Sequence, residues 1–147
     1  MWIIYEGIKR SIKSISFSHF KGEIERGSKQ QTYRTNHIPY YEPNELTALT
    51  WKRAEILFLA PITDYYPKRI CDVNTEEAIA DGFKSIKEFR EGLCQINKVK
   101  PDHWGFLINW DYTLRECPSH FDGKYFHFKG KSQPSVLEYL LKEKEAT

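Results

Sequence analysis

The chain has 147 residues and a formal net charge of +2; 40% of its residues are hydrophobic and 15% are aromatic. This composition excludes a disordered chain, and no run reaches the roughly 20 apolar residues that a membrane helix needs. So small a net charge does not by itself indicate a nucleic-acid binder. We expect one soluble domain over residues 1–147.

The N-terminal residues and the cysteines indicate in which cellular compartment the protein is expected. The first residues show no basic region before an apolar run and no small-residue cleavage site, so no signal peptide is expected. The three cysteines are widely spaced and odd in number, which fits free thiols in a reducing compartment. We therefore expect a cytoplasmic protein without disulfides.

The N-terminal part predicts two strands, a helix and a third strand. Strands are expected at residues 3–5 and 12–17, and a helix from 18 to 26 ends at Gly27, where a left-handed residue often stands. Residues 29–34 suit a strand whose side chains alternate between two faces. One face would hold Lys29, Gln31 and Tyr33, and the other Gln30, Thr32 and Arg34. A twist or bulge at the strand's start would let Lys29 and Thr32 share one cleft.

A loop rich in proline and tyrosine follows at residues 36–44. Its Tyr40 and Tyr41 either stack on bases or close one end of a barrel. Next, the nearly apolar run at residues 54–59 predicts a core strand that Pro61 ends. A further strand is expected after Pro67, with Ile70 or Cys71 pointing inward.

Two capping signals predict helices in the middle of the chain. Asn74 followed by Glu77 begins a helix that ends at Gly82, and Ser85 followed by Glu88 begins a longer one. The apolar residues of the second helix recur every three or four positions and should face the core: Ile86, Phe89, Leu93 and Ile96.

The C-terminal part predicts one long strand and a tail. Residues 104–112, rich in aromatic and branched side chains, suit a strand that crosses a small barrel. Residues 116–130 suit an added edge strand, and a capping box at Ser135 predicts a short C-terminal helix. An exposed aromatic patch would instead favour a protein-interaction module; its candidates are Trp104, Trp110 and Phe126.

Two stretches resemble the ASCH family. Residues 27–34 read G-S-K-Q-Q-T-Y-R, follow the segment 15–20, and match the family pattern of a phenylalanine-rich strand, a short helix and G-x-K-x-Q-T-x-R. Residues 75–89 resemble the second family stretch, with an acidic residue before Gly82-Phe83 and a serine-capped helix. The resemblance implies an α+β fold: a small PUA-like β-barrel with short helices packed on one side. Its core would span about 12–112, with a C-terminal extension over 113–147.

The same resemblance implies a cleft that binds RNA or a nucleoside or nucleotide ligand, without a cofactor. The expected ligand contacts are Gln31, Arg34, Tyr40 and Tyr41. One bacterial branch is similar to small amidohydrolases that act on N4-acetylcytidine through a Lys, a Thr and a Glu, and other members are similar to nucleases. For an amidohydrolase, the resemblance implies catalytic roles for Lys29, Thr32 and Asp81. Asp81 departs from the family Glu, and the missing methylene would place its carboxylate about 1 Å short.

The residues themselves leave several roles open. A desolvated Lys29 is able to act as a base or nucleophile, or it contacts a phosphate or carboxylate. Thr32 suits orienting a water or a carbonyl, or it is simply a strand former. Asp81 ends a helix, where the macrodipole disfavours a carboxylate unless a cation such as Lys29 or Arg34 is near. Residues 1–34 carry seven Lys or Arg against three Glu, an excess that would attract phosphate.

A zinc site is a weaker alternative. Cys117, His120 and His127 begin a plausible ligand set, but a structural zinc needs four ligands. The fourth would come from far along the chain: His103, Cys94 or His37. We therefore expect no metal.

Overall fold

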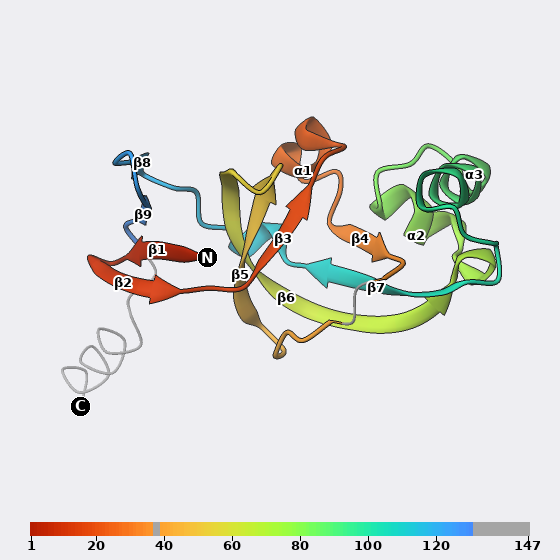
Figure 1. Cartoon of the computed structure of the whole chain (residues 1–147), viewed down its shortest axis with the longest axis horizontal. Helices are drawn as coiled ribbons and strands as arrows, with labels where there is room; N and C mark the ends of the chain where they lie inside the picture. The colour runs from red at the N-terminus through yellow and green to blue at the C-terminus, as the bar shows by residue number, and fades with distance from the viewer. Residues whose placement is uncertain (37–38, 131–147) are drawn as a thin grey trace, which may run out of the picture.

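The computed structural model describes residues 1–36 and 39–130, and Figure 1 shows two β-sheets with short helices. The strands are β1 (Trp2–Tyr5), β2 (Ile8–Ser11), β3 (Ser14–Phe17), β4 (Gln31–Arg34), β5 (Glu45–Trp51), β6 (Glu55–Arg69), β7 (Trp104–Trp110), β8 (His120–Phe121) and β9 (Phe126–Phe128). The helices are α1 (Lys21–Arg26), α2 (Thr75–Ala80) and α3 (Ile86–Asn97), with 3₁₀ turns η1 (Ile70–Asp72) and η2 (Tyr112–Leu114).

The larger sheet has the order β3-β5-β6-β7-β4, and the smaller has the order β2-β1-β9-β8. Within the larger sheet, β3 runs parallel to β5 and the other neighbours are antiparallel. This sheet curls into a half-barrel, and the long strand β6 bends along its length (Figure 1). The predicted α+β class is confirmed. Because β3 and β4 are the two edges of the curled sheet, the half-barrel stays open between them.

The helix ends follow the local signals of the sequence. Gly27 ends α1 with a left-handed φ of 82°, and its N–H donates to the carbonyl of Ile24. Asn74 forms a complete capping box at α2, and the Ser85 side chain caps α3. The first helix starts later than predicted, because Phe20 adopts a left-handed φ of 67° that helical backbone does not allow.

The prediction that Pro61 ends a strand is wrong, because β6 continues through it as one strand of 15 residues. Leu59 exchanges two backbone hydrogen bonds with Glu116, so the N–H and C=O groups of Leu59 point away from β5. Pro61 lies two residues on and points the same way, where its carbonyl accepts from Asp111. The missing N–H therefore removes no bond to β5. Pro67 lies where, among the described strands, only β7 pairs with β6.

Three apolar clusters form the core. The first fills the half-barrel between β3, β5, β6 and β7; the second lies between β7, η1 and the helices α2 and α3; the third joins β1 and β9 to β5 and β6. Ile70 points inward as predicted, with 0% exposure, whereas Cys71 is half-buried in η1. Phe89 and Leu93 are also buried, but Ile96 is 62% exposed because it lies near the end of α3, beyond the core.

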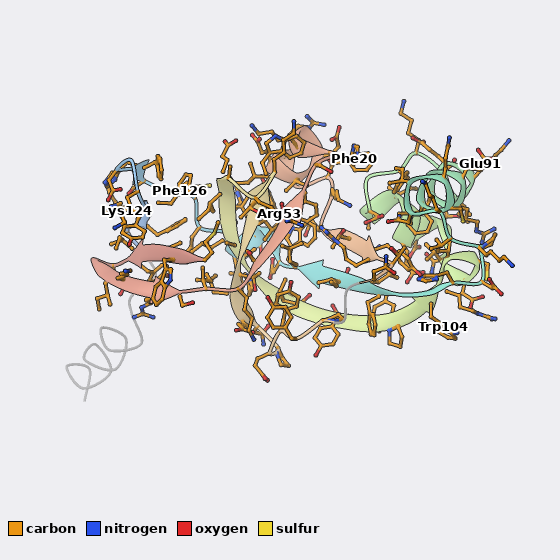
Figure 2. The ribbon with its side chains drawn as sticks, viewed as in Figure 1. Phe20, Arg53, Glu91, Trp104, Lys124 and Phe126 are labelled. Atoms are coloured by element: carbon orange, nitrogen blue, oxygen red, sulfur yellow. The ribbon has the colours of Figure 1, made fainter. Side chains whose placement is uncertain are left out.

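The predicted aromatic patch does not form. Trp110 is 2% exposed and packs edge-on against Phe17 in the first cluster. Trp104 is 61% exposed, and Figure 2 shows it at the opposite end of the molecule from Phe126. Trp104 and Trp110 lie at opposite ends of β7, one exposed and the other buried. The two tryptophans therefore do not share an exposed patch.

The tail beyond β7 joins the N-terminal strands. As predicted, residues 116–130 contribute strand structure, and β9 pairs in parallel with β1. The helix predicted from Ser135 lies outside the described residues. Among the described helices, none is long and apolar enough to cross a bilayer.

Candidate functional site

A cavity of about 610 Å³ lies at the opening between β3 and β4. This volume is in the range of small-molecule sites. Its aromatic lining includes Phe17 at the end of β3, Phe20 just before α1 and Phe83 after Gly82. Its polar lining includes four of the predicted site residues: Lys29, Thr32, Arg34 and Asp81. The family signature and the second family stretch therefore meet at one cavity.

Lys29 and Asp81 form a buried ion pair in this cavity. Each is 3% exposed, and the distance from Lys29 Nζ to Asp81 Oδ1 is 2.8 Å. The ammonium also donates to the backbone carbonyls of Gln31, at 2.7 Å, and of Asp81. These three acceptors use all three donors of the ammonium. Lys29 therefore contacts a carboxylate, one of its predicted roles, and has no donor left for a ligand in this arrangement.

Burial shifts the proton affinities of both partners. It lowers the pKa of Lys29, and the Asp81 carboxylate opposes that shift. It raises the pKa of Asp81, against the opposing effects of Lys29, the Tyr33 amide and Arg34. Both shifts favour the neutral forms. Moving the shared proton from Nζ to Oδ1 thus costs less here than in water.

The start of β4 explains how Lys29 and Thr32 reach the same cavity. The strand begins only at Gln31, so the rule that side chains alternate between the two faces of a strand does not apply to Lys29. Thr32 and Arg34 share a face, and Arg34 Nε donates to Thr32 Oγ1 at 3.1 Å. Gln31 lies on the opposite face and donates to the carbonyl of Glu77 at 2.9 Å. Gln31, a predicted ligand contact, therefore lies outside the cavity lining.

The position of Asp81 at the end of α2 depends on its cation. A carboxylate is disfavoured there, and Lys29 supplies the positive charge that the sequence called for. The shorter side chain of Asp81 reaches Lys29 and also accepts from the N–H of Tyr33 at 3.1 Å. The nearby Glu77 is directed elsewhere, because its carboxylate accepts from Tyr66 and from Lys68, each at 2.6 Å.

Gly82 lets the aromatic wall approach the ion pair. Its φ is 99°, and a Cβ there would lie 3.2 Å from the Phe20 ring and 3.3 Å from Lys29 Cδ. Phe20 in turn packs edge-on against Phe83 with centroids 5.2 Å apart and lies 5.3 Å from Lys29 Nζ. Sequence reasoning did not place Phe20 or Phe83 in the site. The sequence did offer one signal for them, because Phe20 and Phe83 lie within the two stretches that resemble the ASCH family.

The whole chain was compared with known sequences and solved structures. No family model and no curated protein matches the sequence. Solved structures do match: an ASCH domain from Lactobacillus crispatus is 15% identical, with a TM-score of 0.55 over 69% of this chain and 79% of that one. ASCH from Zymomonas mobilis is 10% identical, with a TM-score of 0.54 over 87% and 92%. The chain has the ASCH fold. A protein from Enterococcus faecalis also matches, at 10% identity and a TM-score of 0.58 over 76% and 86%.

The two tyrosines of the loop before β5 have different places in this ASCH fold. Tyr41 is 2% exposed and packs in the first core cluster, so its ring is not a platform for a base; its expected contact with a ligand stays a prediction. Tyr40 is 53% exposed, and its ring stacks on that of Tyr41 with centroids 5.0 Å apart. Tyr40 therefore remains the candidate for stacking on a base.

Replacing Tyr40 with Ala is expected to weaken binding of single-stranded RNA by about 1 to 3 kcal/mol, because one stacking platform is lost. The melting temperature should change little, since Tyr40 is 53% exposed. Tyr40 lines a small cavity of about 330 Å³ beside Lys13 and Glu45. Tyr65→Ala is the control, because Tyr65 is also exposed but lines neither this cavity nor the one between β3 and β4. Equal losses for both variants in a fluorescence titration would exclude a specific role for Tyr40.

No metal site accompanies the ASCH fold in the described part of the chain. No group of three or more His, Cys, Asp or Glu there is placed to hold an ion. His120 and His127 stack with centroids 4.2 Å apart, and His127 bonds Asp122 at 2.6 Å. His37, one of the possible fourth ligands, lies outside the described residues.

Proposed function

We propose that the cavity between β3 and β4 binds the base of an RNA nucleotide or of a nucleotide-like ligand. The observation that carries the proposal is the lining of the cavity: phenylalanine rings stand beside polar and cationic groups at one opening. Aromatic rings stack on bases of any sequence, and cations attract the backbone. The basic excess of residues 1–34 supports the same class of ligand.

Phe20 is the residue whose loss tests base binding most directly. Phe20→Ala is expected to weaken RNA binding by about 1 to 3 kcal/mol, the usual contribution of one stacked base. Phe121→Ala is the matched control, since Phe121 is 54% exposed and lies in the small sheet. Wild-type affinity should also fall with rising salt, with a slope of about −0.7 per phosphate neutralised. Absence of binding at micromolar protein would refute the proposal.

A second candidate function, hydrolysis of N4-acetylcytidine, is favoured by the buried Lys29–Asp81 pair beside Thr32. In this candidate mechanism, Lys29 first passes a proton to Asp81, a step that burial makes less costly. The neutral amine then takes a proton from a water that attacks the acetyl carbon, while the Thr32 hydroxyl donates to the carbonyl oxygen. The C–N4 bond breaks, the proton passes from Lys29 to N4, and cytidine and acetic acid leave. The acid loses its proton to solvent, and Asp81 returns its proton to Lys29.

A further inference from the structure

Arg34 separates the cavity already described from a second cavity. The second cavity has a volume of about 350 Å³, and the two cavities share Ser16 and Arg34 in their linings. The Arg34 guanidinium crosses the opening of the half-barrel: Nη2 donates to the carbonyl of Ser16 at 2.8 Å, and Nε donates to Thr32. Any ligand that extends past Arg34 from the first cavity would enter the second.

Arg34 has no carboxylate of its own among the described residues, although its guanidinium lies over the Phe17 ring. In the described part of the chain, no carboxylate lies within 4.0 Å of it, and Asp81, the acidic residue of the first cavity, is paired with Lys29. Burial lowers the pKa of Arg34, yet arginine stays protonated in proteins. The first cavity thus contains two cations and one carboxylate. A half-buried charge without its own carboxylate is suited to binding an anion.

The second cavity is suited to an anion. Its lining contains Arg34 and Arg53, together with the hydroxyls of Ser14, Ser16, Tyr41 and Thr50, and no acidic residue. The backbone N–H of Arg53 donates to Ser16 Oγ at 2.9 Å and fixes this segment against β3. The Arg53 guanidinium makes no hydrogen bond or ion pair with any residue of 1–36 or 39–130, so its donors are open to a ligand.

We propose that this second cavity is a phosphate subsite, with the phosphate held between Arg34 and Arg53 while the base lies in the first cavity. The inference rests on the proposed function and narrows it. The preferred ligand is then a phosphorylated nucleotide and not a free nucleoside. A terminal phosphate of a mononucleotide and a phosphodiester of RNA share this chemistry.

The test compares the four ribonucleosides, their 5′- and 3′-monophosphates and short oligoribonucleotides by calorimetry at one ionic strength. For the wild type, a phosphate should raise affinity at least about tenfold, the scale of a charge-assisted hydrogen bond. Arg53→Gln should remove most of that gain and leave nucleoside affinity unchanged. Arg10→Gln is the control, because it makes the same charge change at an exposed residue outside these cavities.

The outcomes separate the two proposals. If nucleosides bind but a phosphate adds nothing, or if Arg53→Gln and Arg10→Gln have equal effects, the phosphate subsite is refuted and the base site stands. If none of these compounds binds, the base site is refuted and the subsite with it. A gain confined to monophosphates would assign a mononucleotide, and a gain shared by the oligoribonucleotides would assign RNA. For RNA, Arg53→Gln should also reduce the salt slope by about 0.7.

Discussion

Asp81→Ala is expected to lower the free energy of unfolding by about 3 to 5 kcal/mol, because it leaves the Lys29 ammonium buried without its counter-charge. The N–H of Tyr33 would lose its acceptor in the same step. Denaturant unfolding monitored by fluorescence measures the change. An exposed pair should behave differently: Glu55→Ala removes the partner of Lys21, at 3.1 Å, and should cost less than about 1 kcal/mol.

A double-mutant cycle separates the ion pair from other effects of the truncation. Lys29→Met alone should also destabilise, since the Asp81 carboxylate then remains buried without its ion-pair partner and keeps, among the described residues, the Tyr33 amide as its hydrogen-bond donor. The double variant Lys29→Met/Asp81→Ala should be more stable than the sum of the single losses predicts, by at least about 2 kcal/mol. If Asp81→Ala does not fold, the double variant still tests the pair. Additive losses would contradict a stabilising interaction between the two charges.

Lys29→Arg is expected to reduce any release of cytidine from N4-acetylcytidine by at least about 100-fold, the usual effect of losing a positioned base. Arginine keeps the charge but does not give up its proton, so it cannot accept one from the attacking water. The measurement is chromatographic detection of cytidine. A melting curve confirms that the variant remains folded with the larger arginine in the enclosed site. Thr32→Val, similar in shape without the hydroxyl, should reduce the rate in the same assay.

The controls for hydrolysis distinguish the two candidate functions. Wild-type protein that binds nucleotides but releases no cytidine would exclude the amidohydrolase and leave the binding proposal intact. A folded and fully active Lys29→Arg variant would keep the enzyme and remove Lys29 as its base. The Lys29→Arg variant is informative because Lys29 Nζ lies 2.8 Å from Asp81 Oδ1, the atom that would receive its proton.

Local features of the fold could be predicted from the sequence, because they depend on near neighbours. The left-handed end of α1 at Gly27 and the caps at Asn74 and Ser85 were predictable, because these signals involve residues within about four positions. The two stretches that resemble the ASCH signature also pointed to the fold, since their residues mark a strand, a turn and a helix start. The division into a core and an extension stays a prediction.

Contacts between distant residues, by contrast, depend on how the sheet and helices pack in three dimensions. Lys29 and Asp81 are 52 positions apart, and the curl of the sheet and the packing of α2 against β4 bring them together. The same packing buried Tyr41 and left its neighbour Tyr40 exposed, although the two look alike in sequence. The second cavity beside Arg34 exists because β3 and β4 do not pair. Such contacts depend on register and curvature, which the pattern of one strand does not specify.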